Sequence, residues 1–226
     1  MGGRAAATPE ISVEPRTRER RLWVIDRPDA VQSEVRIGHV GAARSSEHFF
    51  ALTVLNTVLG GAFTSRLNLN LRERNGFTYG VRSRFSFRRR PGPFQVSTAV
   101  GSDVTADAVR EAIHEIEALI AEGPTEEEVA AARDFVAGVF PLRLETTGQV
   151  ASRLAELIVY GLPDDYYHRY RDRVRAVSVD DAAEAGRTYI RPGELQVVVV
   201  GDARTVAPAL ERLDLGPVEV VEGSGT

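Results

Sequence analysis

Residues 56–81 read NTVLGGAFTSRLNLNLRERNGFTYGV, and the breaks in this stretch set the order of the elements around it. Gly60-Gly61 ends a helix that begins near Ser45 or Ser46, because glycine is the usual residue after a helix C-terminus. A second helix follows through residue 74, and Asn75-Gly76 provides its left-handed stop. Alternation of apolar and polar residues from Thr78 to Phe87 then predicts a strand, with Tyr79 on one face.

The segments on either side of this stretch also alternate with period two. Residues 31–39 predict a half-buried strand, and residues 22–25 form a short apolar run before it. Residues 94–100 alternate again after the loop Pro91-Gly92-Pro93, so we expect them to form the hairpin partner of residues 78–87. The N-terminal half therefore predicts strands, two helices and a hairpin in that order.

From Ser102 the apolar period becomes helical. Gly123-Pro124 ends the first of these helices, and Pro141 is expected to kink or break the second. The remaining predicted elements are helices at 146–160, 165–174, 178–189 and 206–213, and strands at 195–200 and 218–221. This order predicts an α+β fold: one domain with a mainly antiparallel sheet and helices packed on one face.

Residues 1–19 lack any apolar periodicity and are rich in Ala, Pro, Thr, Glu and Arg. We interpret them as a flexible arm or linker, followed by a single domain over residues 20–226.

Composition excludes several classes of protein. The chain has 226 residues, 28 basic and 32 acidic side chains, a net charge of −4 and no cysteine. All the basic residues are arginine, so Schiff-base and phosphate-binding lysines are excluded, and the missing cysteines exclude thiolate nucleophiles. The acidic balance argues against a nucleic-acid partner, and no apolar run is long enough to predict a transmembrane segment. The bacterial cytoplasm and the periplasm both remain possible locations.

The histidines do not form a metal motif. His39, His48, His114 and His168 are all more than five residues apart, so no helix presents a His pair of the H-x-x-E-H kind. We therefore expect no metal site and no cofactor in this chain, which should bind no stoichiometric zinc by itself.

Arg72 and Tyr79 are the candidate functional residues. Arg72 stands near the end of the second helix and Tyr79 near the start of the next strand, with the Asn75-Gly76 turn between them. A guanidinium and a phenol brought together there would both donate hydrogen bonds to a peptide carbonyl or an oxyanion. On spacing alone, the alternative is that Arg72 pairs with a carboxylate and Tyr79 packs in the sheet.

Several segments resemble the pitrilysin/insulinase-like zinc metallopeptidases, the family that includes the mitochondrial processing peptidases. The most specific are GGAFTSRL at 60–67 and LRERNGFTYGV at 71–81. Supporting segments are GPTEEEVAAARDFVAG at 123–138, FPLRLETTGQVA at 140–151, YGLPDDYY at 160–167 and LQVVVVGD at 195–202. The resemblance implies a module without zinc that faces a zinc-bearing module across a peptide-binding chamber. It assigns the substrate-binding pair to Arg72 and Tyr79.

This chain is then expected to be the substrate-binding, non-catalytic half of a zinc metallopeptidase, inactive alone. The zinc would come from a partner module or subunit, in the same chain or another, or would have been lost. Peptide could add as a strand along residues 92–100 or 78–87, between which the sequence does not choose. The alternative is a non-enzymatic scaffold or interaction module, with Arg88, Arg89 and Arg90 on a docking surface for acidic partners. A homodimer is also possible.

Overall fold

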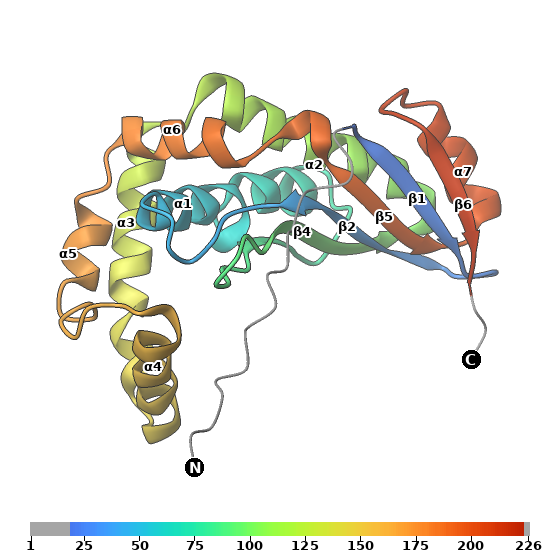
Figure 1. Cartoon of the computed structure of the whole chain (residues 1–226). Coiled ribbons are helices and arrows are strands. Elements are labelled where there is room, and N and C mark those ends of the chain that lie inside the picture. The colour runs from blue at the N-terminus through green and yellow to red at the C-terminus, as the bar shows by residue number, and fades with distance from the viewer. Residues whose placement is uncertain (1–18, 224–226) are drawn as a thin grey trace, which may run out of the picture.

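A six-stranded mixed sheet forms the centre of the protein in the computed structural model, which describes residues 19–223 (Figure 1). The strand order across the sheet is β3-β4-β2-β5-β1-β6. The strands are β1 (Arg21–Asp26), β2 (Gln32–Val40), β3 (Val81–Phe85), β4 (Pro93–Gly101), β5 (Gln196–Gly201) and β6 (Val218–Glu222). The arm expected at residues 1–19 lies almost wholly outside the described residues.

Antiparallel pairing predominates in the sheet, as the sequence predicts. β4 pairs antiparallel with β3 and β2, and β2 pairs antiparallel with β5. β1 is the exception, because it pairs parallel with both β5 and β6. Parallel neighbours require a crossover, and the helices between β1 and β5 supply it.

Only one face of the sheet is buried. In β2, Val35 and Ile37 are each 1% exposed, whereas Glu34 and Arg36 on the opposite face are exposed. Figure 1 shows the helices on the buried side, with α6 (Val179–Tyr189) lying over α1 (Phe49–Asn56) and α2 (Thr105–Glu122) running behind it. The predicted α+β domain with helices on one face is therefore confirmed.

The other helices lie around this core. α7 (Ala203–Glu211) packs on β1 and β6. α3 (Glu126–Val139), α4 (Thr147–Tyr160) and α5 (Tyr170–Arg175) lie beyond the β3 end of the helical layer (Figure 1). Short helical turns complete the chain: η1 (Thr57–Gly61), η2 (Asn68–Arg74), η3 (Ser102–Val104), η4 (Pro141–Leu144) and η5 (Pro192–Glu194).

Local signals placed most helix ends correctly. Thr125 and Glu128 form the predicted capping box at the start of α3, and the helix ends just before Pro141. Two predicted elements are shorter in the structure. α5 begins at Tyr170 rather than 165, after a run of turns, and β3 spans Val81–Phe85 rather than 78–87. Tyr79 therefore precedes the strand instead of lying on its face.

Side chains cap the outer edge of β3. The Asn68 Nδ2 donates to the carbonyl oxygen of Val81 at 2.9 Å, and the Asn68 Oδ1 accepts from the Val81 N–H at 3.2 Å. The Asn56 Nδ2 donates to the carbonyl oxygen of Ser83 at 3.1 Å. β3 is an edge strand, but two asparagines occupy the backbone groups that an added strand would need there.

We expect Asn68→Ala to lower the free energy of unfolding by about 2–4 kcal/mol, because it leaves buried N–H and C=O groups of Val81 without partners. Chemical denaturation measures the change. Asn75→Ala is the control, because the side chain of this exposed asparagine bonds only to Asn70 among the described residues. Equal losses in the two variants would contradict the assigned role of Asn68.

Candidate functional site at the turn before β3

The π-helical segment η2 and the hydrogen-bonded turn of residues 75–77 that follows it position Arg72. The N–H of Asn75 bonds to Asn70 O at 3.0 Å, that of Gly76 to Arg72 O at 3.1 Å, and that of Phe77 to Leu71 O at 2.9 Å. Gly76 adopts a φ of +66°, which reverses the chain as the Asn-Gly pair predicts. Arg72 therefore lies on the last turn of η2, immediately before the reversal.

The Arg72 guanidinium has an unused donor. Its Cζ lies 4.0 Å from the centroid of the Phe63 ring, a cation–π contact. The Nη1 is 3.3 Å from the Glu73 Oε1, yet it is buried without a hydrogen-bond partner. The sequence spacing left open that Arg72 pairs with a carboxylate. The structure has such a contact, with Glu73, but its geometry is not that of a hydrogen bond. The side chain is 30% exposed, so a bound acceptor could reach only the exposed part of the guanidinium and not the buried Nη1.

Tyr79 projects into solvent from an anchored loop. Its side chain is 98% exposed. The residues beside it are fixed, because the Thr78 Oγ1 donates to the carbonyl oxygen of Ala99 at 2.9 Å and accepts from the Gly80 N–H at 3.1 Å. The phenol therefore projects from a backbone that is tied to β4, and it does not pack in the sheet.

The structure places Arg72 and Tyr79 at opposite ends of one tight turn. Within residues 19–223, no hydrogen bond joins their side chains. Both can donate a hydrogen bond, and among the described residues neither side chain donates one, although Arg72 lies beside Glu73. The pair has the composition of a site for a carbonyl or an oxyanion.

Strand addition beside this site is more restricted than expected. Of residues 92–100, all but Gly92 belong to β4, which lies inside the sheet between β3 and β2, so they offer no free edge. β3 is at the edge, but Asn68 and Asn56 already bond Val81 and Ser83. Neither predicted segment can add a peptide strand at these positions while the asparagines stay in place.

In the part of the chain that the structure describes, no group of three His, Asp or Glu side chains could hold a metal ion. His39 has a structural role: its Nδ1 contacts Val40 O at 2.9 Å and its Nε2 accepts from the Arg191 N–H at 3.0 Å. Burial lowers the pKa of His39, in keeping with the neutral ring that this bonding needs. Among residues 19–223, no helix is long and apolar enough to cross a membrane.

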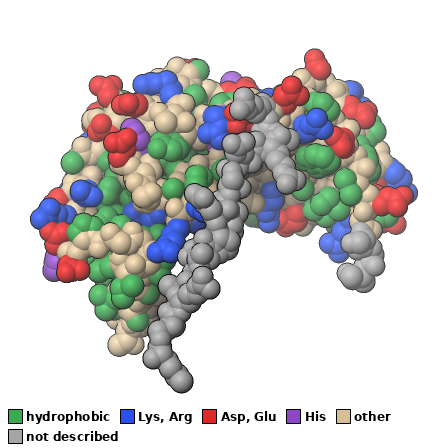
Figure 2. All heavy atoms as spheres, in the orientation of Figure 1, with side chains coloured by type: hydrophobic (Ala, Val, Ile, Leu, Met, Phe, Trp, Pro, Cys, Tyr) green, Lys and Arg blue, Asp and Glu red, His purple; other side chains and the backbone are tan. Residues whose placement is uncertain are grey.

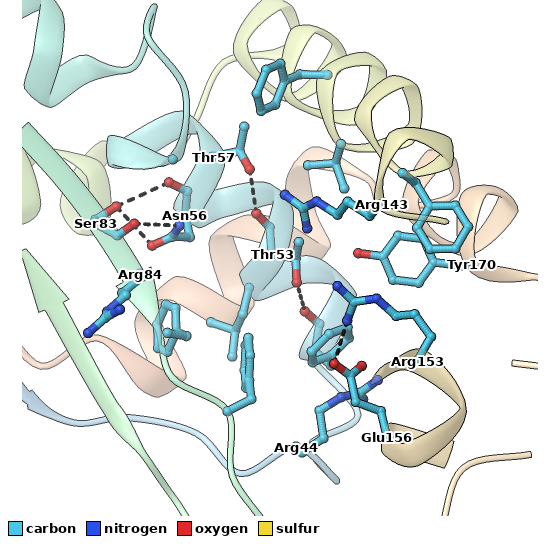
Figure 3. Close-up of a pocket in the computed structure, with 18 of the residues that line it drawn as sticks. Arg44, Thr53, Asn56, Thr57, Ser83, Arg84, Arg143, Arg153, Glu156 and Tyr170 are labelled. Carbon is cyan, nitrogen blue, oxygen red and sulfur yellow. Dashed lines mark hydrogen bonds and ion pairs between the residues drawn. The ribbon is translucent and has the colours of Figure 1, made fainter. Parts of the chain in front are cut away.

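Sequence reasoning missed a cavity of about 320 Å³ between α1, β3, α3 and α4 (Figure 3). Its polar wall includes Arg44, Arg143, Arg153 and Glu156, which come from segments far apart in the sequence. No local motif could have revealed this cavity.

The arginine-rich loop of residues 88–90 is attached to α4. The Arg89 Nε donates a hydrogen bond to the carbonyl oxygen of Val159, near the end of α4, at 2.9 Å.

Residues 4–136 match the model of the peptidase M16 inactive domain. An uncharacterized zinc protease of Mycobacterium bovis is 32% identical over 168 residues, which cover 74% of this chain and 38% of that protein. A non-peptidase homolog of Helicobacter pylori is 25% identical over 153 residues, covering 67% of this chain and 35% of the homolog.

The fold matches as well. The inactive M16 peptidase domain of Pseudomonas fluorescens has a TM-score of 0.79 at 23% identity, covering 88% of this chain and 47% of that one. The chain spans well under half the length of the curated relatives it matches. By sequence and by fold, this chain belongs to the peptidase M16 inactive domain family, whose domains occur in zinc-protease-like proteins.

Proposed function

We propose that this domain is the substrate-binding, non-catalytic half of a zinc metallopeptidase, with the zinc site supplied by another module or subunit. The observation that carries the proposal is the 98% exposure of Tyr79, whose phenol projects into solvent seven residues after Arg72 from a backbone that is tied to β4. A tyrosine with a structural role would ordinarily be packed or hydrogen-bonded.

The two side chains have separate roles in this proposal. Tyr79 donates its O–H to the carbonyl oxygen of the scissile bond as that oxygen becomes an oxyanion. Arg72 donates to a neighbouring carbonyl that does not react, and so holds the peptide in place. Zinc in the partner module would supply an activated water, and a partner glutamate would act as general base.

Tyr79→Phe should lower kcat of the assembled peptidase by roughly 10²–10³-fold, the usual effect of removing one oxyanion donor. The melting temperature should not change, because the side chain is 98% exposed. Turnover of a peptide by this chain with its zinc-bearing partner measures the effect. Tyr189→Phe is the control: its hydroxyl accepts from the Ser46 Oγ, so that variant should lose stability but not turnover. Full turnover by Tyr79→Phe would refute the assigned role.

Arg72→Ala should raise KM at least as much as it lowers kcat, because its contact exists in both the ground state and the transition state. Steady-state kinetics of the same assembly separate the two constants. Arg74→Ala removes an exposed arginine from the same turn of η2 and should change neither. Matching losses in both arginine variants would indicate a general charge effect instead.

A second candidate function, an interaction module without a part in proteolysis, is favoured by the exposed face of α4. Val150, Leu154 and Ile158 are 39%, 55% and 83% exposed and lie four residues apart, so they form one apolar stripe. Figure 2 shows hydrophobic side chains gathered at the corner where Figure 1 places α4. Stripes of this kind usually mark a contact surface.

We infer that the zinc-bearing module covers this stripe. The relatives are more than twice as long as the segment they share with this chain, so they contain further chain of comparable size. A peptidase half would need both the stripe and the Arg72–Tyr79 pair. A scaffold would need the stripe alone, which makes the two functions separable by mutation.

Leu154→Asp should weaken binding to the zinc-bearing module at least 10-fold, because it places a charge in an apolar contact. Ser152→Asp is the matched control, since it adds the same charge to the opposite side of α4. Analytical ultracentrifugation or calorimetry with the H-x-x-E-H-bearing module measures both. Equal binding by the two variants would exclude α4 from the interface.

A further inference from the structure

The cavity beside α1 carries an unbalanced positive charge. Four arginines line it, Arg44, Arg84, Arg143 and Arg153, and Figure 3 labels all four. The carboxylate in its wall, Glu156, is already engaged, because it pairs with Arg153 and accepts from the Tyr167 hydroxyl at 2.6 Å. Within the described residues, neither Arg44 nor Arg143 forms an ion pair.

Arg44 is the unusual member of this set. It is only 7% exposed, and its guanidinium lies 3.7 Å from the centroid of the Phe49 ring and 4.9 Å from that of Tyr166. Aromatic faces compensate a buried cation only in part. A buried charge normally has an ionic partner, so this arginine is set up to receive an anion.

Three of these arginines act on the same hydroxyl. Burial raises the pKa of Tyr170, the charges of Arg143, Arg153 and Arg44 oppose the rise, and the charge of Glu156 adds a smaller contribution in the opposite sense. Tyr170 is itself buried and lines the cavity, so the positive field of three separate segments converges there. Phe49, Phe85 and Phe140 provide apolar walls around the same space.

We propose that this cavity binds a carboxylate of the peptide substrate, either an Asp or Glu side chain or the C-terminal carboxylate, with an adjacent apolar group against its phenylalanines. Guanidinium groups match a carboxylate in shape and charge, and can hold it with paired hydrogen bonds. This assignment rests on the proposed peptide-binding function and adds a specificity to it.

β3 sets the spacing between the two sites. The turn with Tyr79 lies at the N-terminal end of the strand, and Ser83 and Phe85 line the cavity. About five residues separate them, which is ~16 Å at roughly 3.3 Å per residue of extended chain. The preferred acidic group should therefore lie about five residues from the cleaved bond.

Calorimetry with this chain alone tests the proposal, with acetylated hexapeptide amides that contain Phe-Glu or Phe-Gln at their centre. The Glu peptide should bind at least 10-fold more tightly than the Gln peptide. Arg143→Gln should abolish the difference, and it should still fold because Arg143 is exposed. Arg82→Gln is the control: it removes an exposed arginine of β3 that does not line the cavity, and the difference should persist.

Two further arms identify the source of the carboxylate. A Phe-Gln peptide with a free C-terminus that binds as well as the Glu peptide would assign the site to the C-terminal carboxylate. Inorganic phosphate that binds more tightly than either peptide would overturn the assignment to a peptide. Equal affinity for the Glu and Gln amides, with no gain from a free C-terminus, would overturn the proposal, as would equal losses in Arg143→Gln and Arg82→Gln.

These measurements need neither zinc nor a partner, so they are independent of turnover. Loss of kcat in Tyr79→Phe without carboxylate selectivity would reject the cavity alone. Carboxylate selectivity with full turnover in Tyr79→Phe would reject the catalytic role of the turn alone.

Discussion

The hydrogen bonds of Asn68 and Asn56 to the outer edge of β3 are the constraint on which the rest of the site depends. They join the helical segment of residues 56–74 to the strand that follows it, in place of a neighbouring strand. The fit is close: a Cβ at Gly60 would lie 2.7 Å from both the Ser83 N and Oγ atoms. Only glycine permits η1 to approach β3 this closely. These contacts fix the start of η2 against β3, and the backbone bonds of residues 75–77 fix its end, so together they set where Arg72 and Tyr79 lie.

β3, whose outer edge is bonded by side chains, has a candidate site at each of its two ends. At its N-terminal end, the turn presents an exposed phenol and a guanidinium that packs on Phe63 beside Glu73. At its C-terminal end, Ser83 and Phe85 form part of the arginine-lined cavity. Because the asparagines prevent a peptide from pairing with Val81 and Ser83, a bound substrate would be held by these two ends and not by backbone pairing along β3. Side-chain contacts give selectivity that uniform backbone pairing does not.

Most of the fold could be predicted from local patterns, because they depend on nearby residues. The capping box at Thr125, the stop at Asn75-Gly76 and the hairpin of β3 and β4 are of this kind. The parallel pairing of β1 could not be predicted, since it depends on which distant strands become neighbours. Arg72 and Tyr79 could be proposed as candidates because one short segment carries both, and their role stays a prediction. The cavity could not, because Arg44 and Arg153 meet only after α4 packs near α1.

All the basic residues of the chain are arginines, which suits the chemistry of the arginine-lined cavity. The chain has a net charge of −4, yet the cavity groups cations with one engaged carboxylate. An arginine is less strongly hydrated than a lysine and stacks on aromatic rings, so Arg44 can remain charged while packed on Phe49. A buried lysine would tend to lose its proton, and the site would lose its attraction for anions. A local excess of positive charge in a chain whose net charge is negative would also favour approach of the acidic end of a peptide to the cavity.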